Sequence, residues 1–177
     1  MAWDTIQTEK RPEDSGRFAA AKAKIAVFAV LAVVWVVLDQ LCKSVFAGQT
    51  PGGILAGPFA GIFDIRLVHN TGGAWGIFSD STVLLGVLSV VVCVVIVAYF
   101  VYAARDLCMV EVIGLALIFA GGIGNAIDRF VQGFVTDFIE FSFFDFPVFN
   151  IADIGVTCGF VILFIGIFIN WRAEKDA

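Results

Sequence analysis

Residues 149–168 read FNIADIGVTCGFVILFIGIF and join one acidic residue, Asp153, to a long apolar run. An apolar run of this length is typical of a helix that crosses a membrane. A carboxylate inside hydrocarbon costs about 3 kcal/mol on insertion scales, so such a residue normally has a partner or a functional role. The stretch therefore predicts a membrane helix that begins beside a carboxylate in need of a partner.

The composition of the whole chain agrees with a membrane location. Of its 177 residues, 60% are hydrophobic, and the mean hydropathy is +0.95. Soluble domains usually contain about 45–50% apolar residues. The net charge is −5 and only 11 residues are Lys or Arg, which argues against the basic surface that nucleic acid binding needs. We interpret the chain as an integral membrane protein with one domain and no nucleic acid partner.

The cysteines and the single histidine, His69, do not form a metal-binding or redox pattern. The four cysteines lie in or beside apolar runs and include no C-x-x-C motif: Cys42, Cys93, Cys108 and Cys158. We expect them to be small apolar fillers inside helix bundles, and we expect His69 to be an interfacial polar residue. The sequence therefore predicts neither a metal nor a cofactor.

Four segments are long and apolar enough to span a bilayer as helices. We expect them at residues 25 to about 46, 83–104, 112–127 and 154–170. Glycines 121, 122 and 124 are expected to break the third helix, and Trp171 is expected to mark a membrane interface. The predicted fold class is an all-α membrane protein with four transmembrane helices, a small extracytoplasmic β element and an outer-leaflet loop.

The distribution of basic residues predicts the orientation of these helices. Most Lys and Arg residues lie in an N-terminal tail, residues 1–24, beside the second helix at Arg105, and in a C-terminal tail, residues 172–177. The other two loops, about 47–82 and 129–152, contain only Arg66 and Arg129. By the positive-inside rule, both termini are expected to be cytoplasmic and these two loops external. The membrane domain is expected to cover residues 25–171, and the tail before it to be loose.

The two external loops differ in character. In the first, Phe63, Ile65 and Leu67 alternate with Asp64 and Arg66, which predicts a strand followed by a glycine turn. The second contains six phenylalanines in a short stretch: Phe138, Phe141, Phe143, Phe144, Phe146 and Phe149. So much aromatic surface is typical of a segment that lies on or dips into the outer leaflet.

Two acidic residues have basic neighbours that can neutralise them. Asp39 and Lys43 are four residues apart, so they share a helix face and can form an ion pair. Asp128 is followed by Arg129, which indicates either a local ion pair at the end of the third helix or a direct chemical role. Arg129 can alternatively hold an anionic or carbonyl group of a ligand.

Asp137 and Asp153 have no Lys or Arg within several residues. Two such carboxyls at one membrane depth would share a proton, because like charges a few ångströms apart cannot both ionise. An aspartic protease uses such a pair, with one carboxylate taking a proton from water and the other acid hydrogen-bonding the carbonyl under attack. The residues alone leave two alternatives open, which are proton-relay carboxylates of a transporter and plain interface residues.

Five motifs follow one another along the chain: Asp39-Gln40-x-x-Lys43, NTGGAW at 70–75, GGIGNAIDR at 121–129, VTDF at 135–138 and FNIAD at 149–153. With the spacing of the four helices, they cover residues from about 25 to 171. In this combination the sequence resembles the lipoprotein signal peptidases, also called signal peptidase II. Within these motifs it departs from the family pattern at Gly73, where alanine is usual, and at Trp75, where phenylalanine is usual.

The resemblance implies an aspartic endopeptidase of the bacterial cytoplasmic membrane. Its substrate would be a prolipoprotein with a diacylglyceryl-modified cysteine, cleaved on the N-terminal side of that cysteine. The catalytic pair would be Asp137 and Asp153, and the substrate-binding or supporting residues would be Asp39, Lys43, Asn70, Gly73, Asn125, Asp128, Arg129 and Asn150. The resemblance also implies contact with membrane lipids and inhibition by the cyclic peptide globomycin.

Two other functions stay open from the residues alone. A small proton-coupled transporter component would use Asp39, Asp128, Asp137 and Asp153 as a proton relay. A membrane scaffold would use its glycines and aromatic residues to pack against partner helices. Neither protein would cleave a peptide bond, and that separates both from the peptidase.

Overall fold

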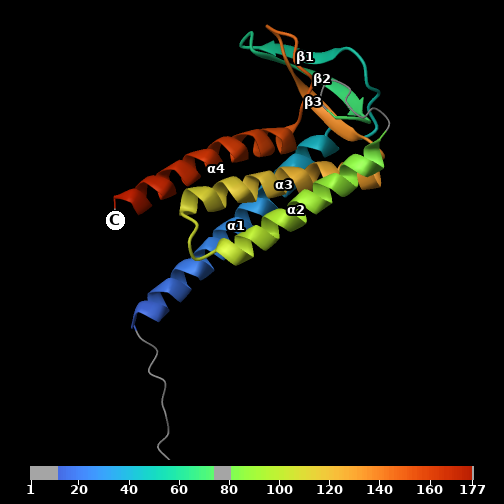
Figure 1. The fold of residues 1–177 in the computed structure, drawn as a ribbon. Helices are drawn as coiled ribbons and strands as arrows, with labels where there is room; N and C mark the ends of the chain where they lie inside the picture. The colour runs from blue at the N-terminus through green and yellow to red at the C-terminus, as the bar shows by residue number, and fades with distance from the viewer. Residues whose placement is uncertain (1–11, 74–80, 177) are drawn as a thin grey trace, which may run out of the picture.

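The computed structural model describes residues 12–73 and 81–176. In this part of the chain, four helices carry a small antiparallel sheet at one end of the bundle (Figure 1). The helices are α1 (Pro12–Ser44), α2 (Thr82–Ala103), α3 (Met109–Val131) and α4 (Ile151–Lys175), and the strands are β1 (Ile54–Phe59), β2 (Phe63–Asn70) and β3 (Val135–Phe141). This arrangement confirms the expected fold class of four membrane helices with a small β element.

All four helices of the described residues are long and apolar enough to cross a membrane. Two expectations about them are wrong. α1 begins at Pro12, so residues 12–24 are helical and do not form the expected loose tail. α3 runs without a break through Gly121, Gly122 and Gly124. The glycines serve close helix packing and do not break the helix. A Cβ at Gly121 would collide with the Ala152 carbonyl oxygen of α4.

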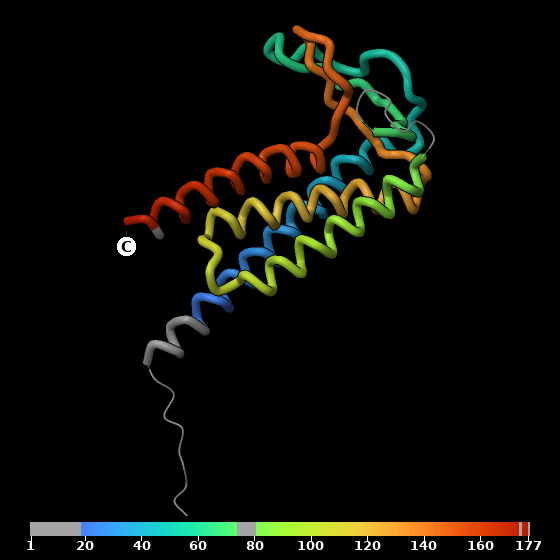
Figure 2. Tube along the Cα trace, in the orientation of Figure 1, coloured from blue at the N-terminus to red at the C-terminus, as the bar shows by residue number. Residues whose placement is uncertain are grey.

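α3 is the central helix of the bundle. It packs against α1, α2 and α4, and most of its span is buried, whereas the other three helices expose most of theirs. The tube in Figure 2 shows α3 running between its neighbours along their length. At its end far from the sheet, an apolar core joins α1, α2 and α3 and includes Phe28, Ile96, Phe100, Val112 and Leu115. The exposed apolar surfaces of α1, α2 and α4 are suited to contact with lipid.

The sheet has the strand order β1-β2-β3, and both strand pairs are antiparallel. β2 confirms the strand expected around residues 63–67. β3 lies within the second expected loop, where the sequence predicted only an aromatic segment. A register shift between Ile65 and Val68 separates the two paired portions of β2 and β3. The portion after this shift pairs Val68 with Asp137 and so brings Asp137 beside the end of β2.

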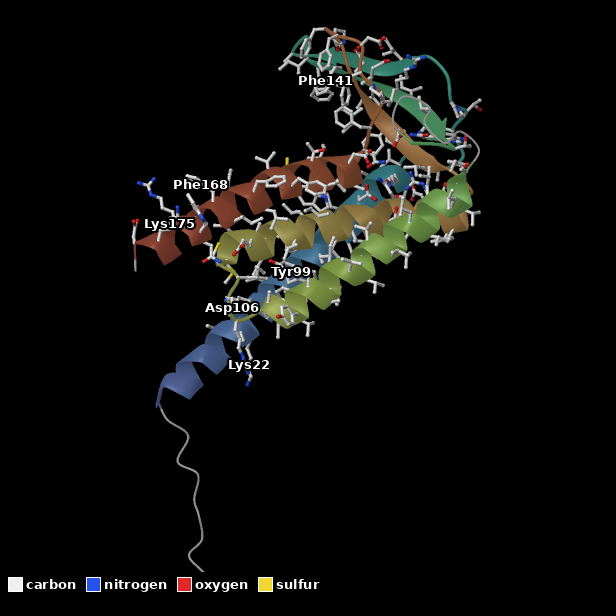
Figure 3. The ribbon with its side chains drawn as sticks, viewed as in Figure 1. Lys22, Tyr99, Asp106, Phe141, Phe168 and Lys175 are labelled. Carbon is white, nitrogen blue, oxygen red and sulfur yellow. The ribbon has the colours of Figure 1, made fainter. Side chains whose placement is uncertain are left out.

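Five of the six phenylalanines of the second loop gather around Phe141, which Figure 3 labels at the end of the sheet far from the helices. The sixth, Phe138, is buried and stacks on Phe46. Phe141 contacts Phe143, Phe144, Phe146 and Phe149, with ring centroids 4.8–5.7 Å apart. Phe149 also bridges to Ile139 of β3, which ties the loop back to the sheet. The aromatic cluster therefore has a structural role in shaping the loop that leads into α4.

The cysteines and His69 differ in how well they match expectation. Cys93 is buried between α2 and α3, but Cys158 on α4 is exposed, so the expectation of a buried filler is wrong for Cys158. The reason is its position on α4 at the wall of a cavity. His69 is exposed and stacks on Phe134, with ring centroids 3.8 Å apart. That position suits an interfacial polar residue.

Close contact between α3 and α4 predicts the effect of adding one methyl group. A Cβ at Gly114 would lie 2.6 Å from the Leu163 nitrogen and 2.8 Å from the Gly159 oxygen of α4, both of them backbone atoms. Gly114→Ala should therefore destabilise the fold by about 1–3 kcal/mol and lower the melting temperature in detergent. Gly53→Ala is the control, because a Cβ there meets nothing within 4 Å. Equal melting temperatures for Gly114→Ala and the wild type would contradict this packing.

Candidate active site

A cavity of about 430 Å³ lies between the sheet and the first turns of α4. Its polar wall contains Asn70, Asn125, Arg129, Asp137 and Asp153. Its apolar wall comes from α4 and from the aromatic loop, and includes Phe141, Phe146, Ile154 and Cys158. The cavity therefore offers two acidic groups on one side and an apolar surface on the other.

Asp137 lies on β3 and is only 2% exposed. Its two carboxyl oxygens accept hydrogen bonds from the side-chain nitrogens of Asn70, at 3.0 Å, and Asn150, at 2.7 Å. Burial raises the pKa of Asp137 to about 7, with the nearby charge of Asp153 adding to the effect and the two asparagine hydrogen bonds opposing it. At neutral pH this carboxyl can therefore carry a proton.

Asp153 lies in the first turn of α4, where a capping box fixes its position. The Asn150 side chain accepts a hydrogen bond from the Asp153 backbone nitrogen at 3.0 Å, and the Asn150 backbone nitrogen donates to Asp153 Oδ2 at 3.1 Å. Asn125 Nδ2 donates to the other oxygen, Oδ1, at 2.8 Å. Since Asn150 also donates to Asp137, one asparagine contacts both carboxyl groups.

A buried ion-pair cluster lies behind the two carboxyls. The ammonium of Lys43 contacts Asp39 Oδ2 at 2.9 Å, Asp128 Oδ2 at 3.1 Å and Asn125 Oδ1 at 3.0 Å. Lys43 is 4% exposed, and both aspartates are fully buried. The i, i+4 pair of Asp39 and Lys43 is confirmed. Asp128 pairs with Lys43, because α3 packs against α1 at this level, so of the two alternatives for Asp128 the local ion pair with Arg129 is wrong.

Arg129 points toward the cavity instead. One of its terminal nitrogens donates to the Gly72 carbonyl at 3.4 Å, and within the described residues its buried Nε has no hydrogen-bond partner. Gly73 lies beside it on the cavity wall, whereas Trp75 falls outside the described residues. All ten residues that the sequence singled out for the site thus lie on this cavity or in the hydrogen-bonded cluster behind it.

Two further residues hold the cluster together and were missed as site residues. Gln40 Nε2 is within 3.2 Å of Asp39 Oδ2, Asp128 Oδ1 and the Gly124 carbonyl oxygen. The Thr136 backbone nitrogen donates to Asp128 Oδ2 at 3.0 Å. Gln40 had a signal, since it is an amide beside Asp39 that directly follows the uncharged apolar run from Ile25 to Leu38. The Thr136 contact is a backbone contact, and its residue type gives no signal.

Fold and site together define a multi-pass membrane protein whose paired carboxyls lie in a cavity at one end of the bundle. The model of the signal peptidase (SPase) II family matches residues 31–169. The chain belongs to this family, whose members named below are lipoprotein signal peptidases, and it is therefore a signal-peptide-cleaving membrane peptidase.

Relatives and a solved structure agree with this assignment. The lipoprotein signal peptidase of Streptococcus pneumoniae is 37% identical over 142 residues, which cover 80% of this chain and 92% of the relative. That of Gloeothece citriformis is 38% identical over 143 residues, covering 80% and 88%. The structure of a bacterial membrane enzyme matches with a TM-score of 0.77 and 30% identity, over 86% of this chain and 94% of that one.

The raised pKa of Asp137 predicts how stability depends on pH. Its carboxyl binds a proton more tightly when folded than when unfolded, so its contribution is full below about pH 4 and is lost as pH rises through about 7. Asp137→Asn removes the ionisable carboxyl, and with it the free-energy cost of burying a negative charge at high pH. Melting curves between about pH 5 and pH 9 should therefore show a smaller loss of stability for the variant than for the wild type.

Asp145→Asn serves as the control for this measurement, because Asp145 is an exposed carboxylate on the nearby loop. It should lose as much stability over this pH range as the wild type. Parallel curves for the wild type and Asp137→Asn would show that Asp137 does not titrate as the geometry predicts.

Proposed function

We propose that this peptidase is a membrane-embedded aspartic endopeptidase with Asp137 and Asp153 as its catalytic pair. Its substrate is a diacylglyceryl-modified prolipoprotein, and it cleaves on the N-terminal side of the lipidated cysteine. The observation that carries the proposal is the meeting of two carboxyls on one cavity wall, each held by asparagine hydrogen bonds and both contacted by Asn150. Membership of the family supports a prolipoprotein as the substrate.

In the proposed reaction, the ionised carboxyl takes a proton from a water molecule, whose oxygen attacks the scissile carbonyl carbon. The protonated carboxyl hydrogen-bonds the carbonyl oxygen and stabilises the negative charge that develops on it. The carbon–nitrogen bond then breaks, and the leaving amine takes a proton from the pair. Water adds across the bond, and the pair ends with the single proton that it had at the start.

The other residues of the cavity have supporting roles in this proposal. Asn70, Gly73, Asn125, Arg129 and Asn150 surround the peptide that the pair attacks. Arg129 supports this view because its buried Nε has no acceptor within the described residues and can donate to a peptide carbonyl. Asp39, Asp128 and Lys43 act from behind the wall, through the buried cluster.

We also propose the orientation of the chain in the bacterial cytoplasmic membrane. Both termini are cytoplasmic, and the active site faces the outer leaflet, with extracytoplasmic loops at about 47–82 and 129–152 and the peptidase domain at residues 25–171. The end of the bundle far from the sheet carries Lys22, Asp106 and Lys175 (Figure 3). Arg105 and Arg172 also lie near this end, in the α2–α3 connection and the last turn of α4. This excess of basic residues supports a cytoplasmic location for that end.

The apolar wall of the cavity supports a lipidated substrate. Ile154, Thr157 and Cys158 lie along α4, which exposes Val161 and Phe164 further along the membrane. An acyl chain can follow this surface while the modified cysteine lies at the carboxyl pair. Attachment of the substrate to the membrane would restrict its search to a plane and favour the reactive orientation. Globomycin is proposed to occupy the same cavity.

The transporter alternative fits the described spans less well. A proton relay needs titratable groups at several depths. Asp39, Asp128 and Asp153 lie together at one end of the bundle, and the next acidic residue within the described spans is Glu111. About 25 Å of apolar α3 separates Glu111 from Asp128, at 1.5 Å per residue. A scaffold, in turn, leaves the buried carboxyl pair unexplained.

Cleavage of a diacylglyceryl-modified prolipoprotein by the purified protein in lipid tests the proposal. Asp137→Asn and Asp153→Asn should each lower kcat by about 10²-fold to 10⁴-fold, because each removes an acid–base group. Asp106→Asn, in the exposed α2–α3 connection at the far end of the bundle, should cleave at the wild-type rate. Circular dichroism and melting curves establish that each variant is folded.

Substantial cleavage by either folded active-site variant would contradict the aspartic mechanism. A folded wild type that cleaves nothing would contradict the proposed function as a whole. In that case, the transporter alternative would be tested next by proton flux into vesicles.

A further inference from the structure

The two carboxyls of the proposed pair have unequal surroundings. Asp153 lies in the first turn of α4, where the helix dipole favours a negative charge, and one of its donors is a backbone N–H, that of Asn150. Asp137 lies on a strand, and both of its donors are side-chain amides. Asp153 is also partly exposed at the cavity, whereas Asp137 is buried. A negative charge is therefore more stable on Asp153 than on Asp137.

The orientation of two amides maintains this inequality. Asn125 turns its oxygen toward Lys43 and Asn150, so its Nδ2 faces Asp153 Oδ1 at 2.8 Å. Asn150 turns its oxygen toward the Asp153 backbone nitrogen, so its Nδ2 faces Asp137 at 2.7 Å and Asn125 at 3.0 Å. If the Asn125 amide were reversed, its oxygen would face a carboxylate oxygen, and Asp153 would lose a donor.

The ammonium of Lys43 prevents that reversal. It has three N–H bonds, and it has three acceptors, on Asp39, Asp128 and Asn125. Because an ammonium can only donate, the amide atom of Asn125 that faces it must be the oxygen. The positive charge is buried, so solvent screens it little and it stabilises a negative charge nearby. Lys43 thus acts on the pair through one intervening side chain.

Building on the proposed function, we propose that Lys43 is a positioning residue that gives the two carboxyls different tasks. By fixing the Asn125 amide, it keeps Asp153 as the ionised base that takes the proton from water. Asp137 keeps the proton and serves as the acid toward the substrate carbonyl. The raised pKa of Asp137, to about 7, agrees with this division.

The dependence of kcat on pH tests the division of tasks. The acidic limb of the wild-type profile reports protonation of the base, and the alkaline limb reports loss of the Asp137 proton. The charged groups that face the pair from the surrounding elements are Lys43 and Asp39 of α1, Arg129 and Asp128 of α3, Arg66 of β2 and Asp145 of the loop between β3 and α4. Only Lys43 contacts Asn125, which donates to Asp153, so its replacement is the informative change.

Lys43→Gln should lower kcat and move the acidic limb to higher pH by about one unit, because the Asn125 amide is no longer held with its Nδ2 toward the ionised base. Asn125→Leu leaves Lys43 and its two aspartates in place but removes the donor to Asp153, and it should move the same limb in the same direction. The double variant should shift the limb no further than the larger single change, since both changes interrupt one path. Lys24→Gln is the control, because Lys24 donates to the Ala104 and Arg105 carbonyls at the far end of α1.

An acidic limb that stays in place while Lys43→Gln loses activity equally at every pH would overturn the proposal, since a purely structural role predicts that result. Additive shifts in the double variant would overturn it as well. If Lys43→Gln does not fold, the pH profile of Asn125→Leu is the test. An acidic limb at the wild-type pH in Asn125→Leu would then reject the proposed division of tasks. These outcomes differ from failure of the proposed function, in which the wild type is inactive or Asp137→Asn and Asp153→Asn stay active.

Discussion

The buried ammonium of Lys43 is the interaction on which the rest of the site depends. A charge inside a membrane bundle is costly unless every N–H finds an acceptor, and here all three do. Each of its aspartate partners reaches a further element, because Asp39 accepts from the Ala152 nitrogen of α4 and Asp128 accepts from the Thr136 nitrogen of β3. One charge thus joins α1, α3, α4 and β3. Gly124 makes this possible, since a Cβ there would lie 2.6 Å from Asp39 Oδ2.

This arrangement explains why the carboxyl pair lies where the sheet meets the helices. β3 supplies Asp137 with a rigid strand backbone, and the first turn of α4 supplies Asp153 with backbone donors. Asn150 precedes α4 directly and connects the two. The same junction leaves one side of the cavity apolar, so a lipidated peptide and an acid–base pair can meet in one place. The proposed chemistry then needs no group deep in the bundle.

Much of the fold follows from the sequence, because apolar runs of span length have few alternatives in a membrane. The pair of Asp39 and Lys43 also follows, since i, i+4 spacing fixes it locally. The contact of Lys43 with Asp128 does not follow, because it depends on how α1 packs against α3. β3 was missed for a related reason: its strand character comes from pairing with β2, and its phenylalanines indicated an interfacial loop. The early start of α1 had a signal in Pro12, Glu13 and Asp14, residue types that favour a first helical turn.

The central claim is that the two carboxyls hold one proton between them at neutral pH. Carbon-13 NMR of protein labelled at its aspartate carboxyls measures this directly, with Asp137→Asn and Asp153→Asn spectra assigning the two signals. At about pH 6 the account predicts one protonated and one ionised carboxyl in the wild type. Two ionised carboxyls, or two protonated ones, at that pH would contradict it.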